Sequence, residues 1–459
     1  MQIYDLKKYK QLFKEYTEVR VQENRNISIS VLNGDVLSNT RSSESGVSAR
    51  VYKGGVWGFS SNPTISDETV QTVINAATEN ALYLNDRVRK NKDPLPGYPG
   101  QAEHDFTTKK PRLSQKQLIT FLKDVDNYIL QKYPDLSART TMLRLLDMEK
   151  QFINSEDSHS LSIVPRSIII TSLSLLKDNQ PFELYEVFGG FGQFEDVFEK
   201  PEDLYEKIDE QYEHLKKKAE GVYAQAGIHE CILGPELAGI LSHEAIGHTV
   251  EADIVMGGSV AADHLGKQVA SPLITMTDFA HHAHGVLCPV PVFVDDEGTK
   301  AEDAVLIKDG VLKTFMHNKE SARHFGVEPT GNARAYQYSD EPIIRMRNTA
   351  IIPGKDKLED MIASIEDGFY LMQASNGQAD STSEFMFGIV KGYEIKNGKL
   401  GKGIKDTTIS GIAFDMLNTI SMVSDDMSWS CGGMCGKKQL IPVGMGGPAV
   451  KCKVKIGGK

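Results

Sequence analysis

The sequence predicts an α+β protein with an N-terminal mixed sheet and packed helices, and a mostly antiparallel C-terminal β domain that carries one histidine-bearing helix. Apolar and polar residues alternate in several early segments, and apolar residues with helical spacing follow them. Asn-Gly or Asp-Gly pairs separate short apolar runs in both halves. We expect the first domain over residues 1–222, with a subdomain junction at 85–113, and the second over 223–459.

The first half mixes strands and helices, each marked by a local signal. Asn33-Gly34 is a two-residue hairpin turn, Ser66 and Ser114 are helix N-caps, and Pro201 suits the first position of a helix. Four prolines between 85 and 113 predict a loop. In order, we expect a helix at 4–16, strands at 27–31, 36–37, 47–52 and 56–59, helices at 66–81 and 114–133, strands between 138 and 187, and a helix at 202–220.

The second half opens with a strand and a helix that Gly234-Pro235 joins, with proline at the first helical position. Asp309-Gly310 and Asn397-Gly398 predict two hairpins, because such pairs favour the tight turns between antiparallel strands. In order, we expect strands at 228–233, 292–294, 305–307 and 311–312, helices at 321–325 and 358–371, strands at 393–395 and near 400, and a strand-like tail at 441–456.

The overall composition argues against several classes of function. The chain has 459 residues and a formal net charge of -11, which suits a nucleic-acid-binding surface poorly. Five cysteines, an odd number scattered through a long chain, indicate a reducing compartment rather than a disulfide scaffold. We find neither a run of 18 apolar residues nor a signal-peptide pattern, so we expect a cytoplasmic protein with no membrane and no nucleic-acid partner.

The most informative stretch holds His243, Glu244 and His248 within six positions. Zinc hydrolases need this combination, because two imidazoles hold the metal and the carboxylate takes the proton of the water that the metal activates. The familiar form has histidines at i and i+4, whereas these stand at i and i+5, about 140° apart on a regular helix. A wide π-type turn, or a helix end near Gly247, would bring them together. The alternative is an ordinary helix whose histidines cap or pair with charges.

A catalytic zinc site usually has three protein ligands, so a third is needed. Cys435 lies in a glycine-rich segment whose backbone can approach an ion closely, and one thiolate with two imidazoles is a chemically normal set. The histidines at 281–284 are more typical of a solvated loop. Spacing alone leaves the third ligand open among Glu251, Asp253, His281, His282, His284, Cys431 and Cys435.

The sequence resembles the metal-bearing TldD branch of the TldD/PmbA family of zinc metallopeptidases. The likeness rests on His243-Glu-Ala-Ile-Gly-His248, with Glu251 and Asp253 after it, and on further short motifs in the family's order. It covers nearly the whole chain. The further motifs are Asn33-Gly-Asp35, Gly46-Val-Ser-Ala-Arg50, Asp295-Asp-Glu-Gly-Thr299, Pro329-Thr-Gly-Asn332, Asn348-Thr349, Pro353-Gly354, Cys435-Gly-Lys437 and Pro442-Val-Gly444.

The resemblance implies that His243, His248 and Cys435 bind Zn²⁺ and that Glu244 is the general base. It also implies a two-domain chain that forms a dimer, either a homodimer or a heterodimer with a PmbA-like subunit that lacks the metal motif. The implied substrates are unfolded or extended peptides, which main-chain hydrogen bonds would hold as an added strand.

Two further residues are candidates for the site. Asp253 could orient a ligand imidazole, although solvation of a helix end is an equal alternative. Arg334 could bind a substrate carboxylate, although a plain salt bridge is the simpler interpretation. Cys431 and the stretch Lys438-Gln-Leu440 depart from the family's pattern, which leaves substrate preference and partner choice open.

Two classes of function are therefore predicted from the sequence. The first is a peptidase that uses activated water, with Glu244 moving the proton. The second is a metal-stabilised subunit that holds a peptide or a partner without cutting it. Glu244 favours the enzyme, because a purely structural zinc site needs no carboxylate at that position.

Overall fold

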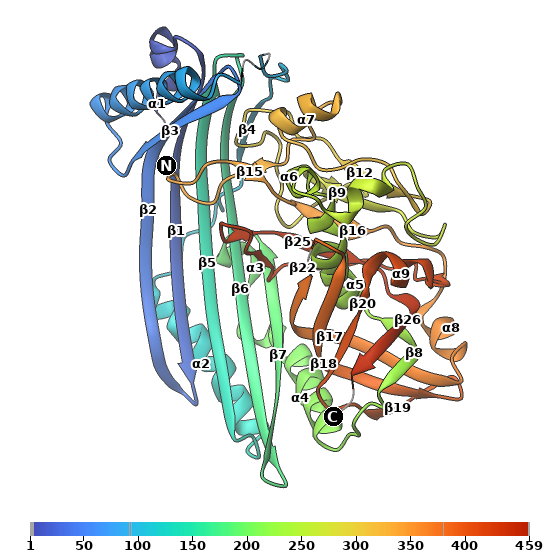
Figure 1. Cartoon of the computed structure of the whole chain (residues 1–459). Helices are drawn as coiled ribbons and strands as arrows, with labels where there is room; N and C mark the ends of the chain where they lie inside the picture. Colours follow the sequence, from blue (N-terminus) through green and yellow to red (C-terminus); the bar gives the residue numbers. More distant parts are fainter. Residues whose placement is uncertain (1–3, 91, 93, 380, 458–459) are drawn as a thin grey trace.

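A long sheet formed by the first strands makes one layer of the molecule, and the C-terminal half of the chain lies against one face of it (Figure 1). The computed structural model describes residues 4–90, 92, 94–379 and 381–457. The fold is α+β, as predicted. No helix in these ranges is long and apolar enough to cross a membrane. The division between residues 222 and 223 stays a prediction.

The N-terminal sheet has seven strands in the order β3-β2-β1-β5-β6-β4, with β7 also paired to β6. Neighbours are antiparallel except β4, which runs parallel to β6. The turn at Asn33-Gly34 joins β1 to β2, as predicted. The strands are β1 Tyr16–Leu32, β2 Asp35–Lys53, β3 Val56–Asn62, β4 Gln101–Asp105, β5 Ala138–Asn154, β6 His159–Lys177 and β7 Gln180–Phe191.

The two faces of this sheet have different roles, because side chains alternate along a strand. In β1 the apolar side chains of Val19 and Ile29 are buried with the helices. The intervening Arg20 donates instead to carbonyls of residues 337 and 340 in the C-terminal half. In β5 and β6, Lys150 and Arg166 likewise reach that half, by contacting Ala335 and Gly433. The face opposite the helices is therefore polar and meets the second half of the chain.

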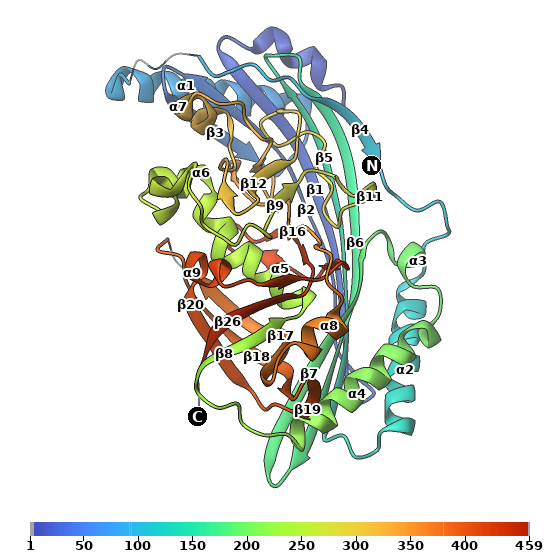
Figure 2. The same ribbon diagram turned by 90° about the vertical axis from the view of Figure 1, so that its right-hand side faces the viewer.

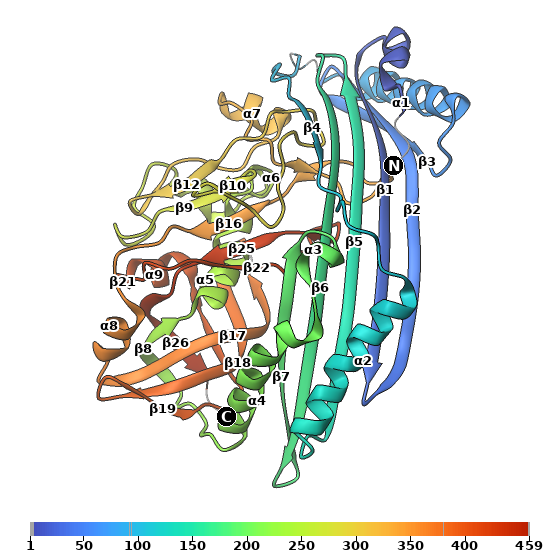
Figure 3. The same ribbon diagram turned by 180° about the vertical axis from the view of Figure 1, so that it is seen from behind.

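Helices cover the other face of the sheet. Figure 2 and Figure 3 show α2 on the side that points away from the C-terminal half, and α4 packs on β6 and β7. Ser66 and Ser114 cap α1 and α2 through capping boxes, as predicted. The helices of this half are α1 Asp67–Val88, α2 Gln115–Lys132, α3 Phe194–Val197 and α4 Tyr205–Ala219, with 3-10 helices η1 Leu6–Leu12 and η2 Pro201–Leu204.

Two expectations for this half need correction. The helix expected at 4–16 is only the short 3-10 helix η1, because β1 begins at Tyr16 and draws the following residues into the sheet. The loop expected at 85–113 includes the last turn of α1 and the strand β4. β4 escapes the pattern because it is short and half exposed, and its strand identity comes from its pairing with β6.

The C-terminal half contains two larger sheets and three strand pairs. One sheet has the order β13-β12-β9-β16-β25-β22. The other has the order β17-β8-β26-β20-β18-β19, and pairing of β17 with β18 closes it into a ring of five strands. The first sheet contains β9 Met276–Phe279, β12 Ala304–Lys308, β13 Val311–Leu312, β16 Asn348–Ile351, β22 Ser428–Ser430 and β25 Gly444–Gly447. The second contains β8 Gly227–Leu233, β17 Asp367–Ala379, β18 Glu384–Lys396, β19 Lys399–Gly403, β20 Thr407–Ile412, β26 Val450–Gly457 and, beside β26, β21 Met422–Val423. The pairs are β10 His282–Ala283 with β11 Val286–Leu287, β14 Ala333–Arg334 with β15 Ile343–Ile344, and β23 Met434–Cys435 with β24 Ile441–Pro442.

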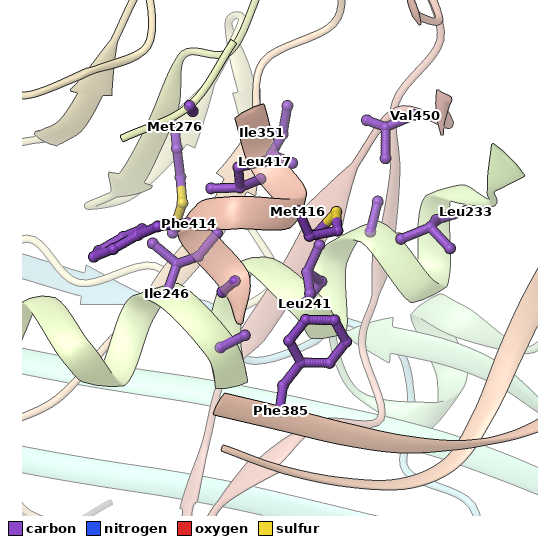
Figure 4. Packing of buried hydrophobic residues seen from close by; sticks show 14 of the residues in the cluster. Leu233, Leu241, Ile246, Met276, Ile351, Phe385, Phe414, Met416, Leu417 and Val450 are labelled. Carbon is purple, nitrogen blue, oxygen red and sulfur yellow. The ribbon is translucent and has the colours of Figure 1, made fainter. Parts of the chain in front are cut away.

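A large apolar core between these sheets supports the helix that carries the histidines. Leu241 and Ile246 pack with Phe385 and with Phe414 and Leu417 of α9 (Figure 4). All five side chains are buried, so their packing fixes the position of the backbone around residue 243. The helices of this half are α5 Pro235–Leu241, α6 Ala252–Met256, α7 Lys319–Phe325, α8 Leu358–Ala363 and α9 Ala413–Asn418, with the 3-10 helix η5 Val260–His264.

Two more predictions are wrong in this half. The helix expected at 358–371 ends at Ala363, because the residues from Asp367 onward form β17 and pair with β8 and β18. The sheet overrides the local helical spacing here. The expected strand at 292–294 is reduced to one bridge between Val294 and Lys300. The hairpins at Asp309-Gly310 and Asn397-Gly398 and the helix at 321–325 are confirmed.

Candidate metal centre

The helix that holds the two histidines changes its winding where they lie. Regular α5 ends at Leu241, residues Ser242–Gly247 (η3) form a π-helical turn, and a 3-10 turn (η4, His248–Val250) follows. A π-turn has more residues per turn than an α-helix and hydrogen bonds between residues five apart, so residues i and i+5 come close to one face. The rings of His243 and His248 accordingly lie with their centroids 5.2 Å apart. Of the two distortions predicted for this spacing, the wide turn is the one that occurs.

Gly247 permits a close approach rather than an unusual backbone angle. Its φ of -53° is helical, so any residue could adopt it. A Cβ at this position, however, would stand 2.1 Å from the Sδ atom of Met346, which is fully buried. The glycine therefore lets the π-turn pack against the segment before β16.

The third donor comes from the far end of the chain. Cys435 lies on β23, in the hairpin with β24, and its Sγ is 3.3 Å from Nε2 of His248. One donor atom from each of His243, His248 and Cys435 lies within 4.8 Å of the other two. A search of the described residues for three or more histidine, cysteine or acidic side chains close enough to share one ion finds this group.

The environment of His243 fits a metal. Its side chain is fully buried, and neither ring nitrogen has a hydrogen-bond partner among the described residues. Buried polar groups are nearly always partnered, so an unpaired imidazole beside another imidazole and a thiol points to an ion between them. Two imidazoles and one thiolate are a normal catalytic donor set for zinc, with the fourth position left for water or substrate.

The thiol and the imidazole of the pair also shift each other's pKa. Burial raises the pKa of Cys435, but the proximity of the two histidine rings outweighs it and lowers the value to about 3. Burial lowers the pKa of His248, but its bonds to Cys435 and Glu251 raise the value to about 10. The cysteine is thus a thiolate at neutral pH, the form that binds metals.

Glu251 orients the second imidazole. Its Oε2 lies 2.8 Å from Nδ1 of His248, which leaves Nε2 directed at the thiol. Its carboxylate is fully buried and also contacts Nζ of Lys437 at 3.1 Å. Asp253, the candidate from the sequence for this role, accepts from Lys437 at 2.8 Å, and the contact with the imidazole comes from Glu251. The spacing of three between residues 248 and 251 is the signal that would have identified it.

Glu244 stands at the open side of the group. Its Oε2 is 3.9 Å from Nε2 of His248, and 28% of its side chain is exposed. His243 is fully buried and 21% of the His248 side chain is exposed, so Glu244 is the most exposed of the three side chains. Glu244 is thus within reach of a water molecule at the group, either directly or after a rotamer change.

Three arginines hold the hairpin that carries Cys435, a role that could not be predicted from the sequence. Fully buried Arg345 donates to the carbonyls of Cys435 (2.6 Å), Lys437 (2.9 Å) and Gln439 (2.8 Å). Arg334 donates to the carbonyls of Met346 and Pro442 at 2.5 and 2.9 Å, and Arg166 of β6 donates to the carbonyl of Gly433 at 3.2 Å. Arg334 forms no ion pair with a described residue, and both of its terminal nitrogens are engaged.

The other candidates from the sequence lie apart from this group. His281 contacts the ring of His282 through their Nδ1 atoms at 2.8 Å and stacks on Phe293, while His284 lies near Phe279. Cys431 is half-buried, with its Sγ 3.9 Å from the carbonyl of Trp429. None of the four belongs to the group around Cys435.

Comparison with known proteins gives a consistent picture. A domain described as the PmbA/TldA metallopeptidase C-terminal domain matches residues 226–458, and PmbA/TldA metallopeptidase domain 1 matches residues 17–81. A metalloprotease TldD homolog of Buchnera aphidicola is 30% identical, over 97% of this chain and 93% of that protein. A zinc metalloprotease TldD homolog of Saccharolobus solfataricus is 29% identical over 90% of each chain, and a metalloprotease of Methanocaldococcus jannaschii is 31% identical over 95% of this chain and 96% of its own.

Solved structures share the fold over almost the whole length. A Thermotoga maritima protein, named as a modulator of a DNA gyrase, superposes with a TM-score of 0.79 at 22% identity over 96% of each chain. TldE of Thermococcus kodakarensis superposes with a TM-score of 0.72 at 19% identity over 98% of each chain. The arrangement of the long sheet and the ring of strands is therefore common to these proteins.

Proposed function

We propose that this chain, which belongs to the PmbA/TldD family of metallopeptidases, is a zinc-dependent peptidase that hydrolyses unfolded or extended peptides. His243, His248 and Cys435 would hold the zinc ion, and Glu244 would be the general base. The observation that carries the proposal is the convergence of three donors from distant parts of the chain, with both ring nitrogens of buried His243 lacking a hydrogen-bond partner in the part of the chain that the structure describes.

When bound, zinc acidifies water and polarises the scissile carbonyl group. The residues of the chain would supply the rest of the chemistry. Glu244 accepts the proton of the attacking water and passes it to the leaving amine. Glu251 keeps the ring of His248 in the orientation that presents Nε2, and Lys437 offsets the buried negative charge of Glu251.

The substrate and the partner follow from the same proposal. An extended peptide can add to a sheet edge through main-chain hydrogen bonds, so the site would accept many sequences in one register. We also propose that the chain works as a dimer, either with a second copy or with a PmbA-like subunit. The fold that it shares with TldE supports a partner of that kind, and mass measurement in solution distinguishes the two arrangements.

Replacement of the carboxylate tests the assignment of Glu244. Glu244→Gln should bind zinc near one ion per chain, because the metal donors are unchanged, but should lose cleavage of an unfolded peptide by about 100-fold or more. Elemental analysis and a fluorescent peptide assay measure the two properties. Glu302→Gln is the control, because Glu302 is exposed and its carboxylate pairs with the exposed Lys300.

Two outcomes would contradict the proposal. Undiminished cleavage by Glu244→Gln would exclude Glu244 as the base. Zinc bound to the unaltered protein without cleavage of any unfolded peptide, alone or with a partner, would favour the second function, a metal-stabilised subunit that binds but does not cut.

A further inference from the structure

A cavity lies between the polar face of the N-terminal sheet and residues 289–294 of the C-terminal half. Its walls are mostly apolar: Leu146, Met148 and Val164 come from β5 and β6, and Pro291 and Phe293 from the facing segment. A space of this kind accommodates an apolar side chain. We call this space the sheet cavity. The face of the sheet that lines it also contacts the hairpin of Cys435, through Arg166.

Arg166, a cation in the wall of the sheet cavity, has no carboxylate counter-charge among the described residues. Only 8% of Arg166 is exposed, and both of its terminal nitrogens donate to the same acceptor, the carbonyl of Gly433, at 3.2 Å. No described carboxylate lies within ion-pair distance of it. Burial lowers the pKa of Arg166 to about 10, so it remains protonated at neutral pH. A buried guanidinium with neutral acceptors alone is costly, and its geometry suits a carboxylate.

The other charged groups that line the sheet cavity are already engaged by hydrogen bonds or ion pairs, although Arg334, like Arg166, has only carbonyl acceptors. Lys150 pairs with Asp296 at 2.6 Å. Asp295 accepts from the backbone N–H groups of residues 297, 299 and 333. Arg334 is engaged by two carbonyls, as described above. Neither acidic residue is therefore available to Arg166, and the wall keeps an excess of positive charge.

We propose that Arg166 binds a carboxylate of the peptide, with the neighbouring apolar side chain of that peptide in the sheet cavity. The inference rests on the proposed peptidase function and gives it a substrate preference. Gly433, which Arg166 contacts, is two residues from Cys435, so the Cα atoms of these two residues are at most about 7 Å apart. A carboxylate anchored there holds the peptide near the candidate metal centre. It comes either from the free C-terminus or from an acidic side chain.

Binding can be measured without cleavage, in zinc-loaded Glu244→Gln protein. The probes are peptides of one sequence that end in leucine, made as the free acid and as the C-terminal amide, and a second pair with aspartate or asparagine before the leucine. We expect the carboxylate form of one pair to bind at least about tenfold more tightly by calorimetry. A preference within the first pair identifies the free C-terminus as the source of the carboxylate, and a preference within the second pair identifies an acidic side chain. Equal affinities within both pairs would overturn the proposal, whether or not the protein is a peptidase.

Substitution of Arg166 tests the residue itself. Arg166→Gln can still donate to Gly433 but carries no charge, so the preference should fall to within about twofold while the zinc content stays unchanged. Arg166→Lys should retain part of the preference. Arg41→Gln, at an exposed arginine of β2, should leave it intact. If Arg166→Gln retained the whole preference for the carboxylate peptide, a group other than Arg166 would bind that carboxylate. Should Arg166→Gln fail to hold zinc, Arg166→Lys decides the question, and an unchanged preference there would contradict bidentate binding.

Discussion

Glu251 is the residue on which the orientation of His248 depends. Glu251→Gln keeps the size of the side chain but removes its charge, so it should weaken zinc binding by about 10- to 100-fold. Competition with a chromophoric chelator measures the affinity. Asp253→Asn is a matched control, because Asp253 shares the contact with Lys437 but does not touch the imidazole. An equal loss of zinc affinity in both variants would show that zinc binding depends on the ion pair with Lys437 and not on the hydrogen bond between Glu251 and the imidazole.

The sequence identifies individual site residues unequally. His243, Glu244 and His248 stand within one motif, so local spacing finds them. Cys435 is selected from several candidate ligands only through the family resemblance, because nothing local relates it to a histidine 187 positions away. Arg166 and Arg345 were not found, since their role is to donate to backbone carbonyls of a distant hairpin, and carbonyls leave no trace in the residue types.

At the scale of elements, α5 has the half-buried acidic side chain of Glu236 in its first turn, and partial removal of this group from solvent makes stability depend on pH. Burial, with the charge of Glu186, raises the pKa of Glu236 from 4.5 to about 7. The folded protein thus holds this proton more tightly than the unfolded chain. The stabilising contribution is complete below pH 4.5 and is lost as the pH rises through 7.

Glu236→Gln should therefore unfold with the same free energy as the unaltered protein near pH 4, and should be more stable by about 1–3 kcal/mol at pH 8. Urea denaturation of the metal-free proteins at both values measures the difference. Glu230→Gln on the neighbouring β8, where 42% of the glutamate is exposed, should show a much smaller change with pH. A constant difference across the range would mean that Glu236 titrates normally.

Local signals predict elements well where the chain decides its own structure. The capping boxes at Ser66 and Ser114 and the Asn-Gly and Asp-Gly turns are local chemistry, and each occurs where expected. The helix predicted at 358–371 fails because Phe369 and Leu371 pair with Cys231 and Leu233 of β8. Residues with both helical spacing and high strand propensity are assigned by their partners, which no local window contains.

At the scale of the molecule, a buried charge network joins the two halves. Arg50 of β2 contacts Glu18 at 2.8 Å and Glu297 of the C-terminal half at 2.7 Å, and all three side chains are buried. Lys319 of α7 reaches Glu156 at 2.6 Å across the same boundary. Breaking such a pair leaves a buried charge uncompensated, which typically costs about 3–5 kcal/mol.

The two tryptophans report on the two halves separately, since Trp57 lies on β3 and Trp429 on β22. Each tryptophan is followed in a variant that retains it alone. With Arg50 in place, the two single-tryptophan variants should unfold at the same denaturant midpoint. Arg50→Met should lower the midpoint, and the Trp57 signal should change first. Arg41→Met, at an exposed position of the same strand, should leave both midpoints in place. Separate midpoints in the unaltered chain would show that the network does not couple the halves.

The distance along the chain between His248 and Cys435 also concerns biosynthesis. After the ribosome has added His248, it must add 187 more residues to reach and include Cys435. During that interval the motif offers an ion its two imidazoles without the third donor of the candidate metal centre. Under the proposed function, a chain shortened before Cys435 would therefore lack a zinc ligand and would not hydrolyse peptides.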